Sequence, residues 1–101
     1  MIARIWRTGI DPARAEEYER FAEERSLPMF RMQEGFRGVL FTTGPDGRRA
    51  VISFWEDAGA VEALDRSVSY RETVAALVGT ALLRGEQSVE LFEVHGGELP
   101  G

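Results

Sequence analysis

Residues 36–55 read FRGVLFTTGPDGRRAVISFW, and this stretch decides the fold. Two runs that are rich in β-branched and aromatic residues, 36–43 and 48–55, flank the segment GPDG at 44–47. Proline has the φ angle that the first central position of a β-turn requires, and glycine tolerates the conformations that close such a turn. The stretch is therefore predicted to be an antiparallel β-hairpin.

The strands of this hairpin carry large apolar side chains on both faces. In the second strand, Val51 and Trp55 lie on one face and Ile52 and Phe54 on the other, because successive side chains of a strand point to opposite sides. An antiparallel sheet with one face in water normally alternates apolar and polar residues. Both faces of this sheet are therefore expected to be covered.

Upstream of the hairpin, the sequence predicts one strand and one helix. Residues 2–8 alternate around apolar positions and are predicted to form a strand. Asp11 and Pro12 mark the start of a helix over residues 12–25, because Asp caps free backbone amides and proline suits the first helical position. Pro28 is expected to interrupt this helix and to leave one extra turn behind it.

Downstream of the hairpin, two helical segments and a last strand are expected. Asp57 can cap a short helix that follows it. Ser69 together with Glu72 matches a capping box, which predicts a second helix over residues 70–79. Residues 87–95 alternate and are predicted to form the last strand.

The order of elements is therefore β-α-β-β-α-β, the ferredoxin-like arrangement of the α+β class with an antiparallel sheet. Residues 1–101 form a single domain in this interpretation, with residues 96–101 as a frayed tail. Two helical regions can cover one face of such a sheet. A second copy of the sheet is the simplest cover for the other face, so we expect a homodimer through that face.

The composition excludes several classes of function. A net charge of −5 disfavours nucleic acid and anionic membranes as partners. The chain contains no Cys, no Lys and no Asn, which excludes thiolate and Schiff-base catalysis, and its single histidine, His95, leaves too few ligands for a zinc site. No apolar run is long enough to span a bilayer and no signal peptide is evident, so a cytoplasmic location is expected.

Five short segments spread over nearly the whole chain carry a family resemblance. They are MIARIWR at 1–7, YERF at 18–21, GFRG at 35–38, SFWED at 53–57 and LFEVH at 91–95. In this order and spacing they resemble the antibiotic-biosynthesis-monooxygenase (ABM) superfamily. The resemblance implies two sheets packed face to face as a dimeric α/β barrel, a pocket between sheet and helices, and cofactor-independent oxidation of a small aromatic or quinol-like compound.

The candidate site residues follow from this resemblance and from residue chemistry. Arg4 lies among apolar neighbours on an expected central strand, and a buried guanidinium needs an acceptor, either a ligand anion or a Glu of the dimer such as Glu90 or Glu93. Arg4 and Tyr70 are the catalytic candidates, with Tyr70 as a hydrogen-bond donor. The expected ligand-binding residues are Trp6, Phe41, Ser53, Trp55 and Tyr70.

These residues also have purely structural interpretations. Trp6 and Trp55 would bury a large area as core or dimer anchors, and Tyr70 could expose its hydroxyl to water at a helix start. The ABM oxygenases and the haem-degrading members both use an Asn that this chain does not have, so haem degradation is not expected. Two functions stay open: a monooxygenase that needs no cofactor or metal, and a non-enzymatic dimeric module that binds a small hydrophobic ligand or has a structural role.

Overall fold

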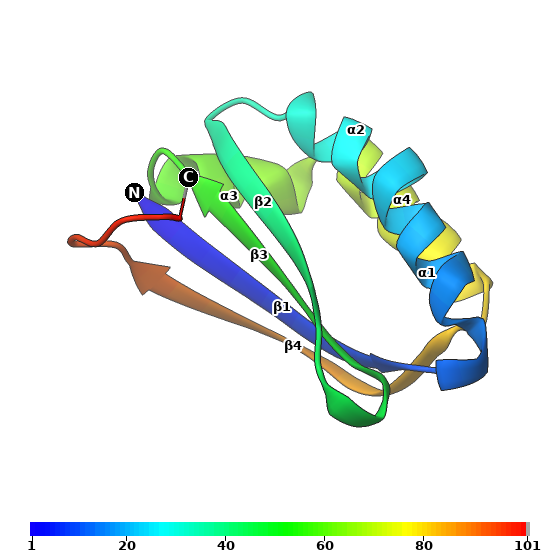
Figure 1. Cartoon of the computed structure of the whole chain (residues 1–101). Helices are drawn as coiled ribbons and strands as arrows, with labels where there is room; N and C mark the ends of the chain where they lie inside the picture. The colour runs from blue at the N-terminus through cyan, green and yellow to red at the C-terminus, as the bar shows by residue number, and fades with distance from the viewer. Residues whose placement is uncertain (101) are drawn as a thin grey trace.

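A computed structural model describes residues 1–100 as one antiparallel sheet with helices packed against it (Figure 1). The strands are β1 (Ile2–Ile10), β2 (Phe36–Thr43), β3 (Arg48–Trp55) and β4 (Leu83–Glu93). Their order across the sheet is β2-β3-β1-β4, and every neighbouring pair is antiparallel. This arrangement confirms the predicted ferredoxin-like α+β fold.

The helical segments form two regions of the chain and one tight turn. The first region contains η1 (Pro12–Arg14), α1 (Ala15–Phe21), η2 (Ala22–Ser26) and α2 (Leu27–Arg31). The second region contains α3 (Ala58–Arg66) and α4 (Val68–Gly79), and η3 (Pro45–Gly47) closes the hairpin. No helix in residues 1–100 is long and apolar enough to cross a membrane.

Pro28 does not interrupt the first helical region, and that prediction was wrong. The segment Ala22–Ser26 is π-helical, and the backbone amide of Leu27 donates to the carbonyl of Ala22 across the widened turn. Pro28 then occupies the first turn of α2, where its missing amide is not needed. The wider turn therefore lets the chain continue as a helix to Arg31.

The start of α4 and both ends of β4 also differ from the prediction, whereas α4 ends at Gly79 as predicted. The hydroxyl of Ser67, not that of Ser69, caps α4 by accepting a hydrogen bond from the amide of Tyr70 at 3.3 Å. The strand β4 begins earlier than predicted, at Leu83, because its first residues pair with the end of β1 across a register shift. It ends at Glu93, also earlier than predicted.

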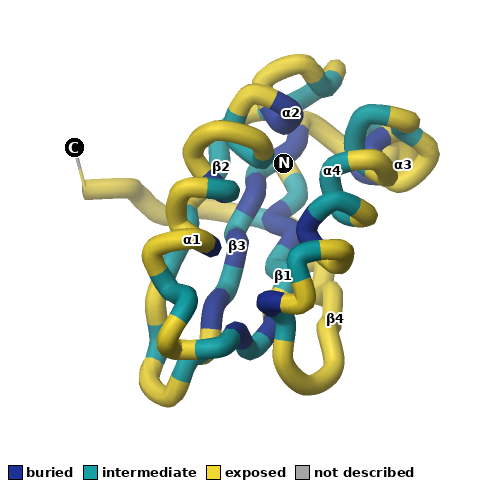
Figure 2. The backbone as a smooth tube through the Cα atoms, turned by 90° about the vertical axis from the view of Figure 1, so that its right-hand side faces the viewer, coloured by how far each residue is buried: buried dark blue, intermediate teal, exposed yellow. Residues whose placement is uncertain are grey.

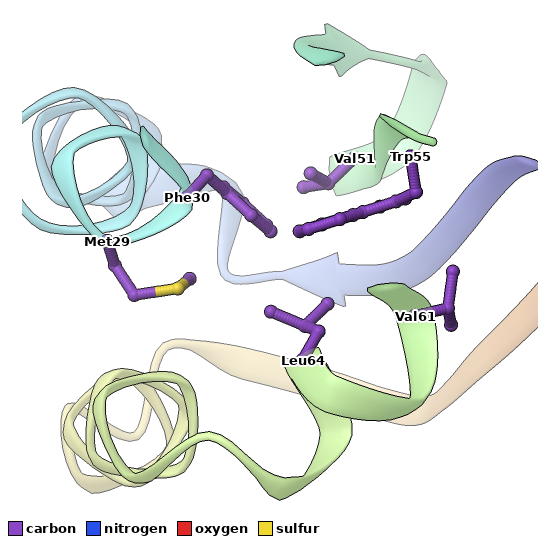
Figure 3. Packing of buried hydrophobic residues seen from close by; sticks show 6 residues of the cluster. All are labelled: Met29, Phe30, Val51, Trp55, Val61 and Leu64. Carbon is purple, nitrogen blue, oxygen red and sulfur yellow. The ribbon is translucent and has the colours of Figure 1, made fainter. Parts of the chain in front are cut away.

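The core lies between the helices and β3. Trp55 is completely buried, with its ring centroid 6.2 Å from that of Phe30 and 5.7 Å from that of Phe36. Figure 3 shows the Trp55 side chain pointing toward Phe30 of α2, with Leu64 of α3 beside it. Its indole Nε1 donates to the Oγ of Ser53 at 2.8 Å. Trp55 therefore joins both helical regions to the sheet.

The opposite face of the sheet is bare of helices (Figure 1). The strand register places five large apolar side chains on it, and β4 is exposed along almost all of its length (Figure 2). We call this surface, made of Ile5, Leu40, Ile52, Phe54 and Phe92, the helix-free face. Leu40 is 46% exposed and Phe92 is 50% exposed. The sheet thus carries apolar residues on both faces, as predicted.

The hairpin turn leaves no room for a side chain at Gly47. Gly47 has φ +78°, and a Cβ there would lie 2.6 Å from the carbonyl oxygen of Ile10. We expect Gly47→Ala to lower the free energy of unfolding by roughly 2 kcal/mol or more, because left-handed strain adds to a clash with fixed backbone. Urea denaturation measures this loss.

The same substitution at the end of α4 is the control. A Cβ on Gly79 meets nothing within 4 Å, so Gly79→Ala is expected to raise the free energy of unfolding by up to about 1 kcal/mol. Equal effects of the two substitutions would contradict the role assigned to Gly47.

Candidate functional site

An apolar cavity lies between the sheet and the helices α1, α2 and α4. Its volume is about 50 Å³, and its wall is mostly aromatic and aliphatic, with Trp6, Phe30, Phe41, Val51 and Leu77 among its members. A volume of this size holds a few water molecules, whereas an apolar cavity that binds benzene measures about 150 Å³. A ring-shaped ligand would therefore have to push side chains of the wall aside.

The structure brings four of the six predicted site residues to this cavity. The four that line it are Arg4, Trp6, Phe41 and Tyr70. The other two, Ser53 and Trp55, are completely buried, bond to each other and are not part of the wall. The hydroxyl of Ser53 also lies 3.5 Å from the carbonyl oxygen of Arg4, so this pair supports the strand that carries the site.

Arg4 is the charged group of the cavity wall. Its side chain is only 5% exposed, and its Nη2 donates to the hydroxyl of Tyr70 at 2.7 Å. The guanidinium carbon also lies 5.3 Å from the centre of the Tyr70 ring, within range of a cation–π interaction. Because the Tyr70 hydroxyl accepts this bond, its own proton remains available to a ligand.

The carboxylate nearest to Arg4 comes from a different element than expected. Within this chain, the Oδ1 of Asp65 lies 3.7 Å from Nη2 of Arg4, whereas Glu90 pairs with Arg7. The reason is the register, which places Glu90 opposite Ile5 on the helix-free face, while Arg4 points toward the helices.

The guanidinium of Arg4 is incompletely satisfied. Its Nε has no hydrogen-bond partner, and the side chain of Asp65 is 59% exposed, so solvent screens the attraction between the two charges. A buried donor without a partner costs about 1–3 kcal/mol. An anionic ligand in the cavity would recover part of this cost, which is a physical reason to place a ligand oxygen near Arg4.

Sequence reasoning missed a second arginine–tyrosine pair beside the cavity. The side chain of Arg49 is 5% exposed, and its guanidinium carbon lies 5.8 Å from the centre of the Tyr18 ring. The signal was present in β3, because Arg49 shares the alternating face of Val51 and Trp55 and must therefore point toward the helices.

The Tyr18 hydroxyl is a protonated donor at neutral pH. Burial raises the pKa of Tyr18 to about 12, and the nearby charge of Arg49 lowers it by a smaller amount. Tyr18 lines the cavity opposite the β1 wall that carries Arg4. Two tyrosines, Tyr18 and Tyr70, therefore line the cavity.

The cavity wall combines an apolar lining with the positive charge of Arg4, which can stabilise a negative charge, but it contains no general base. No carboxylate or imidazole is among the lining residues. In residues 1–100, no three side chains of His, Cys, Asp or Glu gather closely enough to hold a metal ion.

The fold and the cavity define an α+β protein with a pocket between sheet and helices. Neither a family model nor a curated protein matches this sequence. Solved structures do: SnoaB, a cofactor-independent oxygenase from Streptomyces nogalater, has a TM-score of 0.75 at 22% identity, over 95% of this chain and 94% of that one.

Two further similar structures are provisionally assigned antibiotic biosynthesis monooxygenases. The one from Caulobacter crescentus has a TM-score of 0.80 at 15% identity, over 94% of this chain and 90% of that one. The one from Deinococcus radiodurans has a TM-score of 0.78 at 12% identity, with both chains fully covered. The chain therefore has the fold of the ABM structures, as the sequence resemblance predicted.

The raised pKa of Tyr18 predicts a loss of stability at alkaline pH. The pKa is higher in the folded protein than its ordinary value of 10.0, so the stabilisation is complete below pH 10 and is lost as the pH rises through about 12. Two pKa units correspond to about 2–3 kcal/mol. We expect the free energy of unfolding, measured with urea between pH 9 and 12, to fall less steeply in Tyr18→Phe. Identical slopes in the two proteins would show that the hydroxyl is not desolvated.

Proposed function

We propose that this chain is a cofactor-independent monooxygenase-like protein that acts on a small aromatic or quinol-like compound. The buried Arg4–Tyr70 pair at the wall of an apolar cavity carries the proposal. A fixed cation and a hydroxyl donor in a dry site stabilise a phenolate far better than water does. SnoaB, a similar structure, is a cofactor-independent oxygenase, which supports the same class of reaction.

In the proposed reaction, the substrate itself supplies the electrons. A quinol-like compound binds as its anion beside Arg4, and the anion transfers an electron to O2. The resulting substrate radical and superoxide combine, and the peroxide breaks down with loss of water. One oxygen atom stays on the ring and the other leaves as water, so the four electrons that O2 accepts all come from the substrate.

A second function remains in view because of the cavity wall. Its lining holds no group that could remove the phenolic proton, and its volume is about 50 Å³. Both features fit a module that binds a small hydrophobic ligand without transforming it. In that case Arg4 and Tyr70 increase the affinity for the ligand and do not accelerate a reaction.

Oxygen uptake with a panel of hydroquinones and anthrones separates the two functions. If the protein is an oxygenase, Arg4→Met is expected to lower kcat/KM by about 10²-fold or more, because it removes the charge that stabilises the anion. Tyr70→Phe removes one hydrogen bond to the anion and is expected to cost about tenfold.

The control is Arg37→Met, which removes an arginine whose side chain is 56% exposed and absent from the cavity wall. It is expected to keep full activity. Binding of the same compounds without oxygen uptake above buffer would favour the binding module over the oxygenase.

We also propose that the helix-free face joins two copies of the chain into a homodimer. The exposure of Leu40 and Phe92 supports this, since a sheet face rich in apolar residues gains stability when water is excluded from it. A twofold axis would bring this face against the same face of a second copy. The cavity lies on the other side of the sheet and stays accessible.

Light scattering tests the dimer. We expect the wild type to be dimeric at micromolar concentration and Leu40→Glu with Phe92→Glu to be monomeric, because charges would be buried without partners. Val78→Glu is the matched control, since Val78 is 57% exposed on α4, away from the helix-free face. A wild-type monomer would refute this part of the proposal.

A further inference from the structure

A second recess opens beside the apolar cavity, between α1 and the hairpin end of β2 and β3. Its volume is about 190 Å³, and its polar wall includes Arg49, Glu19 and Thr43, which is opposite Arg49 in the sheet. It shares Tyr18, Ala22 and Phe41 with the apolar cavity, so the two spaces meet at these side chains. A ligand long enough to pass them would occupy both.

Arg49 gives this recess a buried positive charge with spare hydrogen-bonding capacity. Its Nε has no partner, and its Nη1 is 3.3 Å from the carbonyl oxygen of Arg48, a long contact for a hydrogen bond. Its Nη2 donates to the Oε2 of Glu19 at 3.1 Å. The Glu19 side chain is 58% exposed, so this carboxylate reaches the guanidinium from the solvent side.

The two buried arginines have similar environments, with Arg4 in the wall of the apolar cavity and Arg49 in the wall of the recess. Arg4 is opposite Ser53 and Arg49 is opposite Thr8, so four positions of the β1–β3 ladder separate them, about 13 Å along the strands. Both point to the helix side, both lie over a tyrosine ring, and both have an unpaired Nε. Burying one guanidinium this way is costly, and the fold does so twice around one space.

Carboxylates of α1 and η2 also line this recess, and they compete with a ligand carboxylate for Arg49. Glu19 and Glu23 line it, and both are exposed. Charges in water are strongly screened, whereas the charge of Arg49 acts from a low-dielectric environment. The oxygen of Glu19 on Nη2 therefore marks a carboxylate position that a ligand could take over while Glu19 turns into the solvent.

We propose that the Arg49 recess binds the carboxylate of an elongated aromatic ligand whose rings fill the apolar cavity and whose hydroxyl meets Arg4 and Tyr70. This inference rests on the proposed function and narrows its substrate class to hydroxylated aromatic carboxylic acids. Arg49 is then the residue that determines specificity, and Glu19 is an internal competitor for the same site.

Calorimetric titration with two matched compounds, 2-naphthol and 6-hydroxy-2-naphthoate, tests the inference. The second compound adds a carboxylate at the end opposite the hydroxyl. We expect it to bind the wild type about tenfold more tightly, because a charge-assisted hydrogen bond is gained at Arg49. Arg49→Met is expected to abolish this preference and to leave the dissociation constant of 2-naphthol unchanged.

Glu19→Gln is expected to change the preference for the carboxylate in the opposite direction to Arg49→Met. It removes the competing carboxylate at an exposed position, so the preference for 6-hydroxy-2-naphthoate should rise by about threefold or more, whereas a purely structural ion pair would not produce this gain. The control Arg48→Met removes the exposed neighbouring arginine, which does not line the recess, and should keep the wild-type preference. Because Glu19→Gln alters only a surface side chain, the test remains decisive if Arg49→Met fails to fold.

The outcomes separate this inference from the proposed function. Binding of 2-naphthol with no gain for the carboxylate overturns the Arg49 site and leaves the cavity proposal standing. Tighter binding of 6-(aminomethyl)-2-naphthol than of the carboxylate also overturns it, since Glu19 and Glu23 would then set the preference. No binding of any of the three compounds refutes the cavity as a ligand site and the inference with it.

Discussion

The alternation of side chains along β3 is the constraint on which the rest of the structure depends. This strand pairs with β1 and with β2, so its direction and register are fixed on both edges. Its residues Arg49, Val51, Ser53 and Trp55 must then all face the helices. Arg49 is the positive charge of the recess, and Val51 lines the apolar cavity. Ser53 supports β1, and Trp55 is at the centre of the core.

The same alternation explains why the site is costly to the fold. A position that faces the helices is desolvated whatever residue occupies it, and at Arg4 and Arg49 that residue is charged. Their ion-pair partners, Asp65 and Glu19, are mostly exposed to water, so these ion pairs recover only part of the desolvation cost. Tyr70 and Tyr18 add ring faces under the guanidinium groups. Groups that are expensive to bury, placed around a cavity, are typical of sites that bind ligands.

Sequence reasoning predicted the features that depend on local pattern. The hairpin, the order of elements and the two apolar faces follow from turn chemistry and from the period of the strands. Arg4 was found because its neighbours are apolar, and the same argument applied to Arg49 would have found the recess. Ser53 and Trp55 were placed among the ligand-binding residues because alternation predicts which side of the sheet a side chain is on. It does not predict whether that side chain lines a cavity or is buried in the core. Whether a side chain on that face reaches a cavity or a helix depends on packing over long sequence distances, as does the π-helical turn that accommodates Pro28.

The walls of the cavity differ in how they can respond to a ligand. One wall is the sheet, from which Trp6, Phe41 and Val51 project. Its strands are paired on both sides or through the hairpin, so displacing their backbone would break sheet hydrogen bonds. On the other side, Ala22 and Ser26 belong to the π-helical turn, where backbone hydrogen bonds span five residues and no sheet ladder holds the chain. The cavity, at about 50 Å³, must enlarge before it can hold a ring, so the enlargement has to come from the helical wall. Ala22 is also where the cavity meets the recess, and the turn that bypasses a proline therefore lies at the junction that a long ligand would cross.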